Sequence, residues 1–354
     1  MAQPENSDWK NKRVAITGVA GSVGRSLVSE LLSREVAEIV GIDNSESSIF
    51  FLRQLYRNRR DVHLYMGDLR SRETLIERFR GCEIVMHAAA LKHVEICEHS
   101  PGDAVLTNIL GTLNVLDAGI AVGAERVILC SSDKAVHPTT VMGTSKLMAE
   151  RLMTAAHMNC AGRGPVCASI RFGNVLGSSG SVIPVFRSQI ARGGPVTLTH
   201  RDMTRFIMTL GDAVNLVLDA AFLMKGGEVF ITKMPAMRIL DLAEIMIDEL
   251  APCGGHNRRA IKIEEVGVRP GEKMFEELLN DEEVTHTLES SRYFIVLPAA
   301  VGRGNSGKVR YDGLECIPAS KPYNSSAGQL LSREELREYL KRSGLLDAGS
   351  EQGF

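Results

Sequence analysis

The chain has 354 residues, 44% of them hydrophobic and 24% charged, a composition that excludes disordered and fibrous proteins and suffices for two globular domains. Its 41 basic and 43 acidic residues leave a net charge of −2, so no global field attracts nucleic acid or an anionic membrane. The polar start is unlike a secretory signal, no apolar run is expected to reach a membrane span, and no Cys/His spacing suggests a metal site. We therefore expect a cytoplasmic protein without a metal or membrane insertion.

Short β-rich runs alternate with longer segments of helical periodicity from residue 12 onward, the pattern of βαβ units around a parallel sheet. The expected strands are 13–17, 38–43, 62–66, 83–88, 126–132 and 168–172. The expected helices are 22–33, 71–80, 104–122 and 144–161. This pattern predicts an α/β fold with a doubly wound parallel sheet and a dinucleotide-binding domain over 1–175. Residues 176–354 are expected to form mainly a smaller substrate-binding domain, with segments at about 205–235 returning to the first.

Glycines follow the first expected strand with a spacing suited to a dinucleotide. Gly18, Gly21 and Gly24 form G-x-x-G-x-x-G at a helix start, where the backbone can turn tightly and approach a pyrophosphate. Asp43 ends the second strand about 20 residues later, where a carboxylate can accept hydrogen bonds from the adenosine ribose. Because this carboxylate would repel a 2′-phosphate, the sequence favours NAD over NADP.

The same loop and the following strand ends supply the other expected cofactor contacts. Asp68 is placed to accept from the adenine amino group, or else to cap a helix. Small residues after the fourth strand allow the backbone to pass close to the cofactor, or else simply allow tight packing. The contacts expected beside the glycines, Asp43 and Asp68 are Ser22, Val23, Leu69, Ala88, Ala89, Ala90 and Lys92.

Ser132, Asp133 and Lys134 follow the fifth strand, at the carboxyl end where open α/β sheets bind ligands. On the next expected helix, Met142 and Lys146 are four residues apart and share a face. A thioether cannot accept a proton, so Met142 cannot act as a base. An adjacent Asp and Lys can also be a plain ion pair in a surface turn, but their position before this helix favours catalysis.

Together these motifs resemble the extended short-chain dehydrogenase/reductase family, which usually carries Tyr-x-x-x-Lys where this chain has Met142 to Lys146. The stretch SSDKAVHPTTVMGTSKLMAERL resembles the active-site segment of UDP-N-acetylglucosamine 4,6-dehydratases, including a subgroup with Met-x-x-x-Lys. Ser132 stands where threonine is more usual. Further similar blocks lie at 89–101, 171–190, 203–206, 240–244 and 268–279, so the similarity covers nearly all of residues 12–340.

The resemblance implies a Rossmann-type fold and a lyase of polysaccharide or glycan biosynthesis that removes water from UDP-N-acetylglucosamine to leave a 4-keto-6-deoxy sugar. Oxidation at C4 acidifies the C5 proton, so a base can remove it while an acid protonates the departing C6 hydroxyl. The implied roles are Lys134 as the C5 base, Asp133 as the acid, Ser132 at the C4 oxygen and Lys146 at the nicotinamide ribose. The group that takes the C4 hydroxyl proton stays open between Lys146, a water and a relay through Ser132.

By the same resemblance, Arg205 and Arg269 bind the pyrophosphate, for which a planar guanidinium is well suited. Asn174 would contact the diphosphate or sugar, Glu272 the uridine ribose, and Lys92 and Asn108 the region of the sugar. A homo-oligomer, dimer or hexamer, is implied as well. The configuration at C5 stays open.

Two alternatives remain. A sugar-nucleotide 4-epimerase, or a dehydratase of another nucleotide sugar, is opposed by Met142 and Lys134. A non-catalytic NAD-binding protein is opposed by the joint presence of Ser132, Asp133, Lys134 and Lys146.

Overall fold

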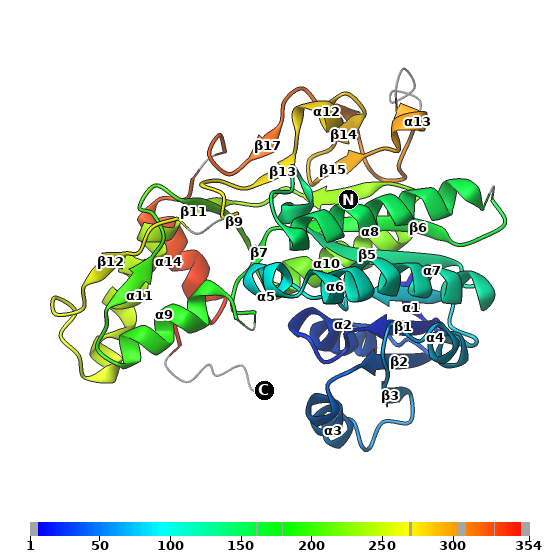
Figure 1. Ribbon diagram of the computed structural model, residues 1–354, viewed down its shortest axis with the longest axis horizontal. Helices are drawn as coiled ribbons and strands as arrows, with labels where there is room; N and C mark the ends of the chain where they lie inside the picture. Colours follow the sequence, from blue (N-terminus) through cyan, green and yellow to red (C-terminus); the bar gives the residue numbers. More distant parts are fainter. Residues whose placement is uncertain are drawn as a thin grey trace. The chain divides into compact units, whose positions relative to one another are not determined.

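The computed structural model describes residues 6–160, 162–178, 180–268, 271–302, 309–328 and 330–347. The chain forms two compact units, each made of three separate segments (Figure 1). Unit 1 comprises Met1–Phe172, Ala213–Lys233 and Asn280–Lys321. Unit 2 comprises Gly173–Asp212, Met234–Leu279 and Pro322–Phe354.

Unit 1 is built on a ten-stranded sheet of order β16-β14-β15-β10-β6-β5-β4-β1-β2-β3. From β3 to β10 neighbouring strands are parallel, whereas β15, β14 and β16 are antiparallel to their neighbours. The strands are β1 (Arg13–Thr17), β2 (Glu38–Asp43), β3 (Val62–Met66), β4 (Ile84–His87), β5 (Arg126–Ser132), β6 (Val166–Phe172), β10 (Val229–Thr232), β14 (Thr287–Glu289), β15 (Tyr293–Val296) and β16 (Ile317–Pro318). This arrangement confirms the predicted doubly wound, mostly parallel sheet.

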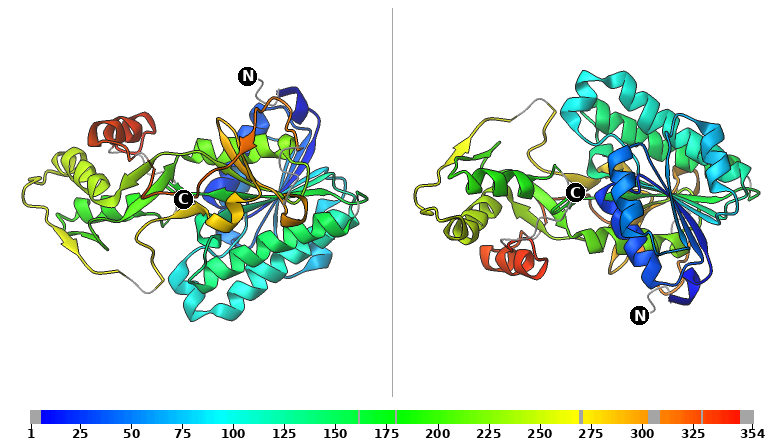
Figure 2. Two further views of the ribbon diagram at one scale, coloured as in Figure 1. Left: turned by 90° about the horizontal axis from the view of Figure 1, so that it is seen from above. Right: turned by 90° about the horizontal axis from the view of Figure 1, so that it is seen from below.

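Helices cover both faces of this sheet, with α7 and α8 on one face and α2 and α10 on the other (Figure 2). The helices are α1 (Asn6–Trp9), α2 (Ser22–Ser33), α3 (Glu46–Leu55), α4 (Arg72–Phe79), α5 (Val94–His99), α6 (Pro101–Ala104), the π-helix η1 (Val105–Leu110), α7 (Gly111–Ala121), the 3₁₀ turn η2 (Asp133–Ala135), α8 (Val141–Asn159), α10 (Leu210–Leu223), α12 (Asp281–Val284) and α13 (Ala299–Gly302). Because both faces are covered, β4 is buried along its whole length and reads as an unbroken apolar run before His87.

The third segment of unit 1 departs from the expected domain boundaries. Residues 280–321 were expected in the second domain, but β15 pairs with β10 and β14 pairs with β15, so this segment extends the main sheet. These added strands cover the edge that β10 would otherwise expose. The first boundary falls after Phe172 instead of residue 175, and the returning middle segment spans 213–233 instead of about 205–235.

A buried ion triad holds this returning segment to the sheet. Arg171 on β6 donates to Glu150 of α8 at 2.8 Å and to Glu283 of α12 at 2.7 Å. Burial alone would lower the pKa of Arg171, but the two carboxylates raise it above its usual value. The guanidinium is therefore charged and satisfied inside the unit.

One helical stretch of unit 1, Pro101–Ala121, is by length and composition apolar enough to cross a membrane. The expectation that no run reaches that length is wrong in this respect. Its apolar window is 44% buried, and α7 packs against α4 and α8. A core helix meets the same length and composition criterion.

Unit 2 contains three small sheets, with strand orders β11-β9-β7, β12-β8 and β13-β17. Its strands are β7 (Asn174–Val175), β8 (Val196–Leu198), β9 (Thr204–Met208), β11 (Ala236–Arg238), β12 (Ile263–Glu265), β13 (Glu277–Leu279) and β17 (Tyr323–Asn324). Its helices are α9 (Val182–Ala191), α11 (Ile239–Leu250), the 3₁₀ turn η3 (Pro252–Gly254) and α14 (Arg333–Arg342). Its core is formed where α9, α11 and α14 bury Phe186, Met246 and Leu336 in one apolar cluster.

Candidate active site

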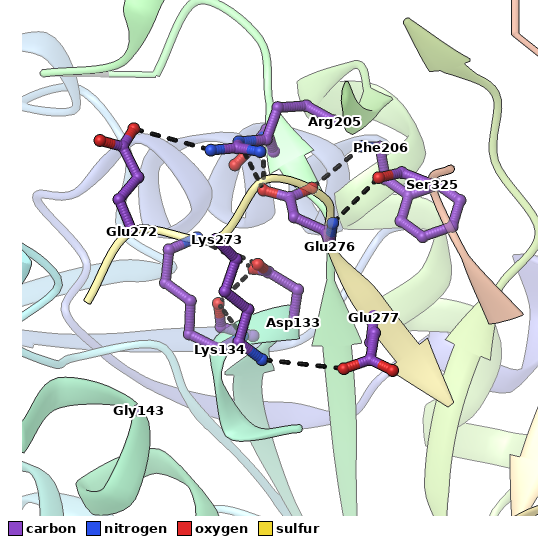
Figure 3. A network of polar contacts seen from close by, with 12 residues as sticks. Asp133, Lys134, Gly143, Arg205, Phe206, Glu272, Lys273, Glu276, Glu277 and Ser325 are labelled. Carbon is purple, nitrogen blue, oxygen red and sulfur yellow. Dashed lines mark hydrogen bonds and ion pairs between the residues drawn. The ribbon is translucent and has the colours of Figure 1, made fainter. Parts of the chain in front are cut away.

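Ser132, Asp133 and Lys134 stand where β5 ends and η2 begins. The Ser132 hydroxyl donates to Asp133 Oδ1 at 2.7 Å, and Lys134 Nζ lies 3.1 Å from Asp133 Oδ2 (Figure 3). Asp133 is 5% exposed, whereas the Lys134 side chain is 37% exposed. The carboxylate is therefore fixed by two donors, while the amine keeps an accessible side. Such a pair suits proton transfer to and from a bound ligand.

Helix α8 brings Lys146 to the same strand. Lys146 Nζ donates to the backbone oxygen of Cys130 at 3.0 Å, and the residue is 6% exposed. Burial lowers the pKa of Lys146, because the ammonium group loses its hydration. Met142, one turn earlier, packs against Cys97 and Ala104 in a small apolar cluster. The thioether thus occupies an apolar pocket and supplies no proton-transfer group.

Gly143 allows α8 to approach the catalytic turn. A Cβ atom at this position would lie 2.4 Å from the backbone oxygen of Lys134. The side chain of Thr140 caps the helix by accepting from Gly143 N at 3.1 Å, which starts α8 at Val141 instead of the expected residue 144. The glycine and the cap together set the position of η2 against the helix.

Asn108 lies in the π-helix η1 and has its amide fully engaged with protein groups. Its Oδ1 accepts from Leu91 N at 2.8 Å, and its Nδ2 donates to Leu91 O at 3.0 Å and to Ser145 Oγ at 2.9 Å. Asn108 is only 2% exposed. This arrangement favours a positioning role, joining the loop after β4 to α8, over the sugar contact expected from the sequence.

A buried polar chain that the sequence reasoning missed continues from Asn108. Thr112 Oγ1 donates to Asn108 O at 2.7 Å and lies 3.1 Å from His87 Nε2, while His87 Nδ1 lies 2.7 Å from Thr17 Oγ1. Burial lowers the pKa of His87 to about 3, so the ring is neutral at physiological pH. A histidine at the end of an apolar strand was the available sequence signal.

The glycine loop has the shape that a dinucleotide requires. Gly18 has φ +70°, and a Cβ there would lie 2.6 Å from Ala89 N, which explains why residue 18 is glycine. A Cβ on Gly24 would lie 2.2 Å from Gly18 O, so helix and loop pack directly. Helix α2 begins after Gly21 with no side-chain cap and no acidic residue in its first turn. Its amino end, at Ser22 and Val23, is suited to receive a pyrophosphate.

Asp43 braces this loop from the end of β2. Its Oδ2 accepts from Ala20 N and its Oδ1 from Ser45 N, both at 3.0 Å. A carboxylate has about four acceptor sites, so hydroxyl donors can still bind. Asp68 accepts from Arg70 N at 2.9 Å in the turn before α4, but the N-cap of α4 is Ser71, so the alternative of a helix cap at Asp68 is wrong.

The remaining expected cofactor contacts lie at the neighbouring strand ends. Leu69 is buried and would contact a Cβ placed on Gly111. Ala88 N donates to Thr17 O at 3.1 Å, so this backbone passes close to the glycine loop. Ala90 and Lys92 follow in the loop after β4, where Lys92 is exposed.

Unit 2 gathers three of the predicted substrate contacts around one further carboxylate. Arg205 Nε lies 3.3 Å from Glu276 Oε1, and Arg205 Nη2 lies 3.6 Å from Glu272 Oε1 (Figure 3). Asn174 Nδ2 donates to Glu276 Oε1 at 2.9 Å. Glu276 was not singled out from the sequence, although it lies in the block 268–279. Arg269 falls outside the described residues.

Comparison with known proteins places the chain in a family. The pattern of the family described as "Polysaccharide biosynthesis protein" matches residues 14–298. The chain belongs to this family. A protein of Methanocaldococcus jannaschii named as an uncharacterized membrane protein is 41% identical over 346 residues, with 98% of this chain and 100% of that protein covered.

Other relatives of this chain carry more specific names. The probable polysaccharide biosynthesis protein EpsC of Bacillus subtilis is 41% identical over 282 residues, which are 78% of this chain but only 46% of EpsC. The chain thus spans about half of that relative's length. A protein named UDP-glucose 4-epimerase from Rickettsia canadensis is 36% identical over 335 residues, covering 93% of this chain and 95% of that protein.

Several proteins of known structure share this fold. Pen from Bacillus thuringiensis matches with a TM-score of 0.86 and 38% identity, covering 94% of this chain and 98% of Pen. The dTDP-glucose 4,6-dehydratase DesIV from Streptomyces venezuelae, solved with NAD and TYD, matches with a TM-score of 0.64 and 21% identity over 74% of this chain and 86% of DesIV. The fold is that of the extended short-chain dehydrogenase/reductases, and the chain's relatives are named as polysaccharide biosynthesis proteins and as UDP-glucose 4-epimerases.

Proposed function

We propose that this protein is a UDP-N-acetylglucosamine 4,6-dehydratase that uses NAD. The observation that carries the proposal is the fixed Ser132–Asp133–Lys134 set beside the helix of Met142 and Lys146. An adjacent carboxylate and amine can expel water from a hexose, because one can serve as acid and the other as base. An epimerase needs a group that takes and returns the C4 hydroxyl proton, but it has no use for a second base at C5.

The glycine loop fits a dinucleotide, because Gly18 and Gly24 let the loop pack tightly against Ala89 and helix α2, whose amino end lies at this loop without a side-chain cap. When bound, the nicotinamide supplies an acceptor for the C4 hydride and returns it to C6. Asp43 would accept from the adenosine ribose and Lys146 would donate to the nicotinamide ribose. The carboxylate of Asp43 supports NAD over NADP, and the NAD in the DesIV structure is consistent with a nicotinamide cofactor in this fold.

The contacts favour a relay through Ser132 among the three routes for the C4 hydroxyl proton. Ser132 donates to Asp133 at 2.7 Å, so it can pass that proton to the carboxylate while it receives one from the sugar. Asp133, now protonated, gives the proton to the departing C6 hydroxyl. In this scheme Lys134 acts as a neutral amine when it removes the C5 proton, and it later returns that proton to C5. Lys146 is held on Cys130 O and stays a positioning group in this scheme.

We assign binding of the nucleotide diphosphate to Arg205, Asn174 and Arg269, and binding of the uridine ribose to Glu272. A homo-oligomer in the cytoplasm is part of the proposal. The homo-oligomer is supported by exposed apolar side chains on α5, η1, α7 and α8, which another copy of the chain would cover. These side chains are Ile96, Val105, Leu106, Leu110, Leu113, Ile120, Met148 and Met158.

The test is turnover of UDP-N-acetylglucosamine in deuterated water, followed by NMR. We expect a 4-keto-6-deoxy product labelled at C5, and the label also reports whether the C5 configuration is retained. An unlabelled C4 epimer would instead support the epimerase alternative. Lys134→Ala should reduce turnover by roughly 100-fold or more, the usual contribution of a general base, while NAD affinity stays unchanged. Near-normal turnover in this variant would remove Lys134 from the mechanism.

A further inference from the structure

Glu276 is a buried carboxylate of unit 2 whose two oxygens are both engaged. Oε2 accepts from Phe206 N at 2.9 Å, and Oε1 accepts from Asn174 Nδ2 at 2.9 Å. The backbone of Glu276 is fixed as well, because its N–H donates to Ser325 Oγ at 2.9 Å and its carbonyl accepts from Ser325 N at 2.8 Å (Figure 3). The residue is 4% exposed. Its carboxylate therefore has one orientation.

This carboxylate orients the guanidinium of Arg205 from one side. Arg205 Nε lies 3.3 Å from Glu276 Oε1, and its Nη1 donates to Thr204 O at 2.8 Å. The Arg205 side chain is 11% exposed. Its Nη1 also donates to Met274 O at 3.4 Å, and its Nη2 donates to Met203 Sδ at 2.7 Å. The second N–H of Nη2, on the side of the partly exposed Glu272, is the donor left for a phosphate oxygen, and a donor fixed beforehand loses less entropy on binding.

The neighbouring Glu272 differs from Glu276 in its contacts. Its side chain is 30% exposed, and its distance to Arg205 is 3.6 Å, longer than the Glu276 contact. One of its oxygens accepts from Thr199 at 3.2 Å. Glu276, and not Glu272, is thus the carboxylate that joins Arg205 to Asn174.

Resting on the function proposed above, we propose that Glu276 is a positioning residue that holds Arg205 and Asn174 in the orientation that binds the diphosphate of the substrate. Glu276 touches neither the sugar nor the phosphates in this scheme. It acts by keeping two donors aimed before the nucleotide arrives.

The test is a double-mutant cycle read by calorimetric titration with UDP. Glu276→Gln keeps the size of the side chain but removes the charge and one acceptor, and should weaken UDP binding about tenfold. If Glu276 acts through Arg205, the effect of Glu276→Gln should shrink to about twofold or less in an Arg205→Met background. Arg205→Lys replaces Arg205→Met if the latter does not fold. With UDP-N-acetylglucosamine, Glu276→Gln should raise KM with little change in kcat.

Glu277→Gln is the matched control. Glu277 follows Glu276 in the chain, but its carboxylate lies 4.0 Å from Lys273 Nζ instead (Figure 3). We expect UDP affinity to stay within about twofold of the unmodified protein, as for a weak, partly exposed pair. NAD affinity and thermal unfolding establish that each variant is folded.

The outcomes separate the two proposals. If the unmodified protein does not bind UDP, the proposed substrate is wrong and the positioning role of Glu276 falls with it. If the unmodified protein binds UDP and Glu276→Gln binds it equally well, only the positioning role is overturned. Equal losses from Glu276→Gln with and without Arg205 would also overturn it.

Discussion

At the residue scale, His87 links the chemistry of a single side chain to the behaviour of unit 1. Its ring lies between Thr17 on β1 and Thr112 on α7, and Thr112 contacts Asn108 beneath the loop after β4. Burial lowers the pKa of His87 to about 3. The neutral ring therefore links β1 to α7 and, through Thr112, to Asn108 in η1, without changing charge at neutral pH.

His87 predicts an acid-labile component of stability. In the unfolded chain its pKa is about 6.5, so between this value and about 3 the unfolded state binds a proton that the folded state does not. The free energy of unfolding should fall as the pH falls through that window. Relative to His87→Gln, the unmodified protein should lose roughly 1.4 kcal/mol more per pH unit.

Urea unfolding at pH 4, 5, 6 and 7 measures this difference in slope. His99→Gln, at an exposed position of α5, is the matched control and should keep the slope of the unmodified protein. If the free energy of unfolding of the His87→Gln variant fell as steeply with pH as that of the unmodified protein, the lowered pKa of His87 would be contradicted.

At the scale of elements, the position of the proposed catalytic residues depends on how closely helix α8 meets the turn η2. Thr140 starts the helix, Gly143 removes the side chain at the contact and Lys146 reaches back to β5. The active turn is therefore held by a helix end instead of by a long loop. Rigid elements position reacting groups more accurately than loops do.

Gly143→Ala should disturb catalysis through this contact. The new Cβ would lie 2.4 Å from Lys134 O, so η2 or α8 must move. We expect a loss of about 1–3 kcal/mol in the free energy of unfolding, as for overpacked sites, and a fall in kcat roughly 10-fold or larger.

The control is Gly102→Ala in helix α6, where nothing lies within 4 Å of the added Cβ. This variant should keep kcat and gain about 0.5–1 kcal/mol in stability, because alanine favours a helix over glycine. Circular dichroism melting and steady-state kinetics measure both effects. A Gly143→Ala protein with unchanged kcat would show that the turn tolerates displacement.

At the scale of the whole molecule, the chain passes between the two units five times, since each unit is assembled from three segments that alternate along the chain. The last segment of unit 1 is joined to the sheet by β15 and by the pair of Arg171 with Glu283. Glu150 adds helix α8 to the same ion triad. Helix α8 and the returning segment therefore depend on one buried cation.

Arg171→Met should destabilise unit 1 strongly, because it leaves two buried carboxylates without their counter-charge. We expect a loss of about 3–5 kcal/mol in the free energy of unfolding. Adding Glu150→Gln and Glu283→Gln to Arg171→Met should recover part of the loss. Lys10→Met, which removes the exposed Lys10–Glu35 pair, is the control and should cost less than about 1 kcal/mol. Chemical unfolding measures all of these, and a small effect of Arg171→Met would contradict the triad's structural role.

Local patterns predicted the parallel sheet well, since a strand buried on both faces must be apolar throughout and its ends carry distinctive residues. The strand 13–17 and the helix 22–33 have the expected bounds. The antiparallel strands β14 and β15 were missed, because strands of three and four residues are too short to show a clear alternation. Helix α8 starts three residues earlier than predicted. The linear pattern gave no sign that Thr140 caps this helix.

The sequence by itself determined the fold class and the chemical groups of the proposed site, because glycine spacing, strand ends and helix faces follow from local backbone geometry. Only the tertiary structure decided which side chains contact the same carboxylate and which ones form a buried hydrogen-bonded chain. Asn174 and Glu276 are far apart in the chain, yet Asn174 donates to Glu276 at 2.9 Å. Such contacts form only when packing brings distant segments together, and no local spacing encodes them.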